Sequence, residues 1–249
     1  MPGGIYSFGA GVLVGSVVDS AGVRQSYRFG TLQGIDLTIE ATQKELFGEL
    51  QSAVDTARGT AKYTATAKVG KIQGDMLAML YFNETAVTGH DRLIPAETGT
   101  PSTNTYTALN AGTPWKDLGV RSAVNGQRYK RVASAPTAGQ YSVVEATAVY
   151  TFAAGDANAV TVIVTYVYRA SGGQRFVINN QQMGLAPVFE AYLSQARFTK
   201  SMLLHMNAGI STKLGMPTKL DDYQIFDFGV SFFGDATDKI GDFNFSDID

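Results

Sequence analysis

The clearest hydrophobic pattern in the chain is an alternation with a period of two between residues 34 and 69. Apolar Ile35, Leu37 and Ile39 alternate with polar or charged neighbours, and the same alternation returns over residues 60–69. A period of two places apolar side chains on one face of a β-strand and polar side chains on the other. The sequence therefore predicts a pair of strands, each with one apolar face. The apolar positions are Ile35, Leu37, Ile39, Ala41, Ala61, Tyr63, Ala65, Ala67 and Val69.

A short helix is predicted directly after the second of these strands, over residues 76–82. Gly70 and Gly74 end the strand, and Asp75 can accept hydrogen bonds from the first free amides of the helix. The apolar residues of this segment would pack back on the sheet. They are Met76, Leu77, Met79 and Leu80.

Residues 45–57 carry a mixed signal. Apolar residues recur there at helical spacing, and Thr42 with Glu45 has the form of a capping box. Gly48 interrupts the pattern. On the residue pattern alone a helix is favoured over an irregular or extended segment.

The second half of the chain reads as a series of strands. Residues 141–152 and 160–168 alternate strongly and are predicted to form a hairpin across a turn at Gly155 and Asp156. Further strands are predicted at residues 23–29, 186–198, 200–211, 223–233 and 242–246. The expected fold is therefore mostly β, a β-sandwich or partly closed barrel with one short packed helix.

The domain organisation is predicted from changes in amino-acid composition along the chain. The 249 residues suit a single β domain over 23–249, preceded by an N-terminal arm over 1–22. The first 18 residues are uncharged, but their glycines and lack of a leading basic residue argue against a signal peptide or membrane span. This arm is expected to lie against its own domain or a neighbouring subunit and to serve assembly. A stretch rich in Thr, Gly, Pro, Asn and Ser predicts a long insertion at about residues 83–137.

Charge is distributed unevenly, although the net charge is only −2. Residues 221–249 contain eight acidic residues and one lysine, a net charge of −7, and residues 1–220 carry +5. Acidic and basic surfaces on different subunits could attract one another, while the alternative is a solvated acidic tail. The inter-subunit candidates are Arg121, Arg128, Lys130 and Arg131 on the basic side, and Asp235, Asp238 and Asp242 on the acidic side.

Residues suited to catalysis or metal binding are scarce. The chain has no cysteine, which fits a reducing cytoplasm, and its two histidines are His90 and His205. His205 is expected to be a satisfied core or edge residue, and neither a phosphate loop nor a calcium loop is complete. We therefore predict no catalytic residue, no metal, no cofactor and no enzyme activity. A glycosidase-like pair among the 22 acids stays open, since the sequence singles out none.

Several runs of sequence point to one family. Residues 29–82, FGTLQGIDLTIEATQKELFGELQSAVDTARGTAKYTATAKVGKIQGDMLAMLYF, resemble a block found in tail tube proteins (major tail proteins) of long-tailed bacteriophages. Three later runs follow in the order that such proteins would have. They are AGQYSVVEATAVYTFAAGDANAVTVIVTYVY, NNQQMGLAPVFEAYL and DDYQIFDFGVSFFGDATDKIGDFNFSD. Together these runs cover about half of the chain.

The resemblance implies a structural virion protein made in the host bacterial cytoplasm and located in the phage tail. Such proteins form homohexameric rings whose inner strands join into one continuous β-barrel, and the rings stack into a tube. The lumen holds a tape-measure protein and later passes DNA without binding it specifically. Tail terminator and baseplate or tip proteins would be further partners, and no membrane would be involved. The resemblance also implies an extended connection, not a helix, within residues 45–57.

The polar face of the strand pair is predicted to line the lumen. Its hydroxyls and carboxylates would repel phosphate and permit sliding, with Lys62 and Lys68 pairing with acids of the adjacent strand. The lumen-lining candidates are Asp36, Thr38, Glu40, Thr64 and Thr66. The alternatives are a phage head or adaptor protein, or a β-sandwich binding module that uses the insertion as its recognition loop.

Overall fold

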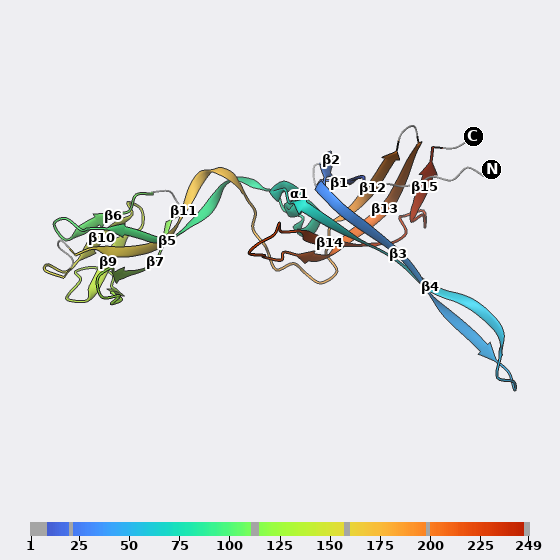
Figure 1. Cartoon of the computed structure of the whole chain (residues 1–249), viewed down its shortest axis with the longest axis horizontal. Coiled ribbons are helices and arrows are strands. Elements are labelled where there is room, and N and C mark those ends of the chain that lie inside the picture. The colour runs from blue at the N-terminus through green and yellow to red at the C-terminus, as the bar shows by residue number, and fades with distance from the viewer. Residues whose placement is uncertain (1–8, 20–21, 111–114, 157–159, 198–199, 247–249) are drawn as a thin grey trace. The chain divides into compact units, whose positions relative to one another are not determined.

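The computed structural model describes residues 9–19, 22–110, 115–156, 160–197 and 200–246 (Figure 1). These residues form a mostly β structure with one helix, as predicted. The chain divides into two compact units. Unit 1 contains Met1–Ala86 and Phe176–Asp249, and unit 2 is residues 87–175. Within the described residues no sheet closes into a barrel, which favours the sandwich alternative.

Unit 1 is built on one large antiparallel sheet. Its strands are β1 (Val12–Val18), β2 (Arg24–Arg28), β3 (Gly30–Phe47), β4 (Ala53–Lys71), β12 (Val188–Arg197), β13 (Lys200–Gly215), β14 (Phe226–Phe232) and β15 (Gly241–Phe245). The order across the sheet is β2-β1-β12-β13-β14-β4-β3, and β15 pairs with the part of β13 that β14 leaves free. The predicted strands at 23–29, 186–198, 200–211, 223–233 and 242–246 are confirmed by β2 and β12–β15.

The register of β3 and β4 confirms the predicted common faces. Ile35 lies opposite Ala67 and Leu37 lies opposite Ala65, so the apolar positions of the two strands share one side. Ala65, Ala67 and Val69 are buried there, because that side faces the core of unit 1. The period-two pattern therefore determines which face of this strand pair is inside.

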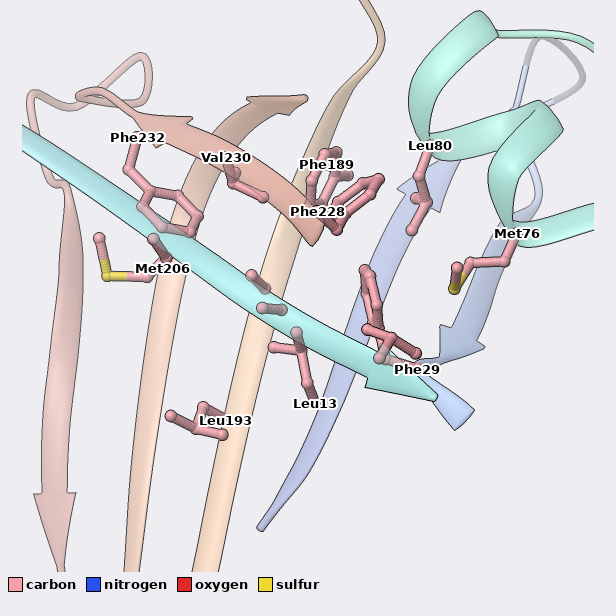
Figure 2. Packing of buried hydrophobic residues seen from close by; sticks show 14 of the residues in the cluster. Leu13, Phe29, Met76, Leu80, Phe189, Leu193, Met206, Phe228, Val230 and Phe232 are labelled. Carbon is pink, nitrogen blue, oxygen red and sulfur yellow. The ribbon is translucent and has the colours of Figure 1, made fainter. Parts of the chain in front are cut away.

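The core of unit 1 is formed by buried side chains of β1, β4, β12, β13 and β14 together with those of helix α1 (Gly74–Phe82). Figure 2 shows Phe29, Phe189 and Phe228 converging in this core, with Leu80 and Met76 reaching down from α1. Gly15 permits this packing, because a Cβ on it would lie 2.8 Å from a methyl group of Leu80. The predicted helix is confirmed at this place.

A carboxylate hydrogen bond stabilises the start of helix α1, and a left-handed residue ends it. The carboxylate of Asp75 accepts a hydrogen bond from the Met76 N–H (2.9 Å) in the first turn. Asn83 ends the helix in the left-handed region, at φ 53°, and the N–H of Glu84 donates to the Ala78 carbonyl (2.9 Å). This left-handed ending satisfies a carbonyl that the helix leaves free.

The N-terminal segment differs from the predicted arm over 1–22. Strand β1 lies between β2 and β12, and Leu13 and Val17 are buried in the core. The glycines that suggested an arm allow close packing instead, as at Gly15. Residues 12–18 therefore belong to the folded sheet, and residues 1–8 of the predicted arm lie outside the described residues.

The helix favoured at residues 45–57 is wrong. This segment is the end of β3, a turn at 48–52 and the start of β4. Leu46 lies opposite Asp55 and Lys44 opposite Ala57, so the segment is an antiparallel hairpin. The long cross-strand ladder outweighs the helical spacing of a few apolar residues, since tertiary pairing overrides weak local propensity.

Unit 2 consists of two smaller sheets. One has the order β5-β11-β7, formed by β5 (Val87–Gly99), β11 (Val162–Arg175) and β7 (Trp115–Ser122). The other has the order β6-β10-β9-β8, formed by β6 (Thr105–Thr107), β10 (Val149–Phe152), β9 (Gln140–Val144) and β8 (Lys130–Arg131). A separate cluster of buried aromatic and aliphatic residues, including Trp115, Tyr150 and Tyr166, fills its core.

The predicted single domain with an insertion at about 83–137 differs from this arrangement. The inserted segment runs from 87 to 175 and has its own core, so it is a second compact unit. The predicted hairpin of residues 141–152 with 160–168 is also wrong. Strand β9 pairs with β10 across a turn at residues 145–148, and β11 pairs with β5 and β7 in the other sheet.

Candidate assembly interface

The most prominent feature of unit 1 is the ribbon, residues 42–60 of β3, β4 and their connecting turn. Strand β14 pairs with β4 only from Tyr63 to Val69, so beyond that point β3 and β4 pair with each other alone. Figure 1 shows the two strands continuing past the rest of the sheet of unit 1. A free two-stranded hairpin is marginally stable in water. The ribbon is therefore an element that gains from a partner.

The end of the ribbon is apolar. Leu50 is 80% exposed in the turn, and Phe47 next to it is 57% exposed. Leu46 and Val54 are exposed as well. Four large apolar side chains at the end of a projecting hairpin favour a contact surface.

A second exposed apolar surface lies at the opposite end of the sheet of unit 1. Strand β4 runs away from the ribbon to Lys71, and near that end Val69 pairs with Phe226. The loop 216–225 precedes Phe226, so it lies at the end away from the ribbon. In this loop Leu220 is 96% exposed and Tyr223 is 87% exposed.

The structure brings the lumen-lining candidates together. Asp36 lies opposite Thr66, Thr38 lies opposite Thr64, and Glu40 continues the same face of β3. This face is the one that points away from the buried Ala65 and Ala67. The five residues therefore form one continuous polar surface, as the alternation predicts.

Charges on this polar face are balanced. Lys62 lies opposite Glu40, and Lys68 lies opposite Asp227 of β14. Lys213 of β13 forms an ion pair with Asp227 at 3.5 Å. The face therefore combines acids, lysines and hydroxyls, and Lys62 and Lys68 each lie opposite an acid of an adjacent strand, where the sequence analysis expected them to pair.

The four basic inter-subunit candidates have separate roles in the structure. Arg131 is bound within unit 2, 3.0 Å from Glu145 and 3.7 Å from Asp117. Lys130 is exposed on β8. Arg121 and Arg128 lie together beside a surface cavity. The sequence cluster thus divides into one arginine with two ion pairs inside unit 2, one exposed lysine and one pair of adjacent arginines.

Two of the acidic candidates are engaged within their own chain. Hydrogen bonds from Thr237, Asn207 and the Lys239 N–H hold the pKa of Asp235 well below its ordinary value. Asp242 contacts the Lys239 ammonium at 2.7 Å. Asp238 is exposed in the same turn, at φ 61°. An inter-subunit role for these three residues stays a prediction.

His205 lies in a polar cluster on the side of the sheet away from the core. Its ring stacks on Tyr192 with centroids 4.2 Å apart, and Nε2 lies 3.5 Å from the Glu190 carboxylate. Burial would raise the pKa of Glu190, but hydrogen bonds from Tyr192 (2.5 Å) and Arg24 (2.9 Å) outweigh it and lower this pKa. His205 pairs with β12 on one side and β15 on the other, and its Nε2 is buried without a hydrogen-bond partner among the described residues. The prediction of a satisfied core or edge histidine is therefore wrong.

Sequence reasoning missed two buried carboxylates in unit 2. Glu97 accepts hydrogen bonds from Tyr106 (2.7 Å), from Tyr166 and from the Leu109 N–H (2.8 Å). Because the partners are distant in sequence, no local motif marks this residue. Both carboxylate oxygens of Glu97 accept hydrogen bonds from groups of the protein itself, as expected for a buried carboxylate with a structural role.

Asp117 is held in the same way. It accepts hydrogen bonds from Tyr141 (2.6 Å), Tyr150 (3.1 Å) and the Gly119 N–H (3.0 Å). Burial, followed by the neighbouring carboxylates, raises the pKa of Tyr106, Tyr141 and Tyr150. These tyrosines therefore act as neutral hydrogen-bond donors over a wide pH range.

Among the residues that the structure describes, no three His, Cys, Asp or Glu side chains are grouped to hold a metal ion. No helix in the described part of the chain has the length and apolar character needed to cross a membrane.

Comparison with protein-family models finds no match, and comparison with curated proteins finds none either.

Proposed function

We propose that this chain is the structural subunit of a bacteriophage tail tube, polymerising as stacked homohexameric rings around a channel for DNA. Its partners would be further copies of itself, a tape-measure protein, a tail terminator and a baseplate or tip protein. The proposal rests on the sequence resemblance and on one structural observation. That observation is the pair of exposed apolar surfaces at opposite ends of unit 1.

Two different surfaces at opposite ends favour a head-to-tail contact. The apolar end of the ribbon, around Phe47 and Leu50, would pack on the loop around Leu220 and Tyr223 of the next subunit. A head-to-tail contact repeats without closing along its axis and so generates a filament or tube. Burying one large apolar side chain contributes about 1.5–3 kcal/mol, so even a few per subunit support a long polymer.

Within a ring, the open edges of the sheet would pair between subunits. Strands β2 and β3 are the two edges of the main path of the sheet. Exposed strand edges are a liability that proteins pair, cover or charge. The polar face with Asp36, Thr38 and Thr64 would then line the channel. Its balanced charges would give DNA no strong attraction, since phosphate binding depends on an excess of cations.

The test is negative-stain electron microscopy of the purified full-length chain and of the double variant Phe47→Ser, Leu50→Ser. The wild type is expected to form long tubes, and the variant to remain in rings or monomers. Losing two such side chains removes about 3 kcal/mol or more from each inter-subunit contact and weakens it about 150-fold or more. Gln51→Ser, in the same exposed turn, is the matched control and should leave tubes unchanged.

Circular dichroism shows whether the variants keep their β structure, since all three positions are exposed. Discrete wild-type rings at every concentration would favour a head or adaptor protein. A wild-type monomer under all conditions would favour a binding module. Tubes that form equally well with the double variant would remove the ribbon from the assembly contact.

A further inference from the structure

Two arginines of unit 2 face each other directly, Arg121 near the end of β7 and Arg128 in the segment that turns back beside it. Arg121 and Arg128 are partners in an antiparallel bridge. The Tyr129 N–H donates to the Val120 carbonyl (3.0 Å), and an equivalent bond lies on the other side, so the arginines form a non-hydrogen-bonded pair. In such pairs the side chains are closest, and like charges directly opposite one another are destabilising.

Neither guanidinium is compensated within the described residues. Arg121 and Arg128 are both exposed, and neither guanidinium makes an ion pair or hydrogen bond with a residue that the structure describes. Arg131, a short distance along the chain, does contact Glu145 and Asp117. Asp156, whose carbonyl accepts a hydrogen bond from Tyr129, has its carboxylate bound to the Gly139 N–H. Two adjacent positive charges are therefore left for an anion.

A surface cavity adjoins the pair. It has a volume of about 440 Å³, and its lining includes both arginines, Leu118, Tyr129 and Thr165. This volume is in the range of small-molecule sites and exceeds what a lone inorganic anion fills. The site therefore combines two fork-shaped donors with room and apolar surface for an organic group.

We propose that Arg121 and Arg128 bind the phosphate group of a small organic phosphate monoester, such as a sugar or polyol phosphate. A phosphate monoester carries a charge of about −1.5 to −2 at neutral pH, which matches two guanidiniums, whereas a carboxylate carries half of that. Its three oxygens can accept parallel hydrogen bonds from both arginines. The carbon skeleton would lie against Leu118 and the ring of Tyr129. This site lies in unit 2 and does not depend on the proposed tube.

Isothermal titration calorimetry on the full-length chain at low salt tests the proposal with four probes. They are glycerol 3-phosphate, inorganic phosphate, acetate and a short Asp-rich peptide. We expect glycerol 3-phosphate to bind most tightly, and Arg121→Gln and Arg128→Gln each to weaken it about ten-fold or more, since a charged hydrogen bond is lost. Lys130→Gln removes the same charge nearby but outside the cavity lining, and should change the affinity less than two-fold.

Folding is checked separately by the fluorescence of Trp115, the single tryptophan, which is buried in unit 2. Without ligand, Arg128→Gln should unfold at the same denaturant concentration or a higher one, because it removes a like-charge pair. Inorganic phosphate binding as tightly as the ester would overturn the organic part of the proposal. Tighter binding of acetate or the acidic peptide would assign the pair to a carboxylate-bearing partner and overturn it. Binding by neither phosphate would also overturn it.

Discussion

At the scale of single residues, unit 2 is organised around carboxylates that tyrosines hold. Asp117 joins Tyr141 of β9, Tyr150 of β10 and the backbone of β7, and so connects the two sheets. Trp115 stacks on Tyr166 with centroids 5.0 Å apart and meets Tyr150 edge-on. Polar and aromatic contacts thus share one core, in which each hydroxyl needs its acceptor.

Removing the Asp117 carboxylate should therefore destabilise unit 2 strongly. In Asp117→Ala two buried hydroxyls and the Gly119 N–H lose their acceptor, and each orphaned group costs about 1–3 kcal/mol. We expect a loss of about 3 kcal/mol or more in the free energy of unfolding, measured by urea denaturation with Trp115 fluorescence. Glu145→Ala, which removes only a part-exposed ion pair, should cost less than about 1 kcal/mol. A similar small loss for Asp117→Ala would contradict the structural role.

The same tyrosines predict an alkaline limit to stability. The pKa values of Tyr106, Tyr141 and Tyr150 are raised in the folded state, first by burial. The folded state therefore keeps protons that the unfolded state releases above about pH 10, the ordinary pKa of tyrosine. Stability should be constant below that pH and fall above it, by up to about 1.4 kcal/mol per pH unit for each such tyrosine.

Urea denaturation followed by Trp115 fluorescence at a series of pH values from about 9 to 11 measures this slope. Tyr141→Phe removes one titrating group and should make the slope shallower. A free energy of unfolding that does not change over this range would mean that these tyrosines ionise in the folded protein. None of this could be read from the sequence, because the partners of each hydroxyl come from other strands.

At the scale of elements, the strand pair β3–β4 shows what the sequence can and cannot predict. Alternation at Ile35, Leu37 and Ala65 was enough to predict its strands and its buried face. For residues 45–57 of the ribbon the residue pattern slightly favours a helix, because Leu46, Leu50 and Val54 have helical spacing, whereas the family resemblance implies the extended structure that is observed. In the structure these side chains are exposed at the end of the ribbon. Their helical spacing therefore does not mark the buried face of a helix.

The polar face of this pair gives a prediction about accessibility in assembled tubes. Since the chain has no cysteine, Thr38→Cys introduces a single thiol on that face. If the face lines the channel, a small maleimide should label assembled tubes, whereas a maleimide on a large polyethylene glycol should not enter. The unassembled variant should react with both reagents, which controls for local burial. Equal labelling of tubes by both reagents would place Thr38 on the outer wall.

At the scale of the whole molecule, the chain forms two units with separate cores. Composition predicts an insertion that ends at about 137, where the stretch rich in Thr, Gly, Pro, Asn and Ser gives way to strongly alternating strands. The pairing of β11 with β5 places them in unit 2 instead. Alternation along one strand shows that one of its faces is buried, but it does not show which of the two cores that face joins. The long-range pairing therefore could not be predicted from the sequence.

Unit 1 should fold without unit 2. Val87 and Arg175, the two ends of the inserted unit, are cross-strand partners. Paired residues on antiparallel strands have Cα atoms only about 5 Å apart, so a short Gly-Ser linker can replace residues 87–175. We expect the shortened chain to keep cooperative unfolding by circular dichroism and, under the proposed function, to form tubes. Residues 87–175 alone should unfold cooperatively by Trp115 fluorescence. A shortened chain without cooperative unfolding would mean that unit 1 depends on unit 2.

The pairing of Val87 with Arg175 also makes this chain a natural attachment point for foreign sequences. The geometric condition concerns only the spacing of two chain ends, not what lies between them. Any domain whose own termini are neighbours meets that condition, whether it is a fluorescent reporter, an enzyme or a peptide antigen. A polymer of such subunits would then display the inserted domain at regular intervals, with one copy for every subunit.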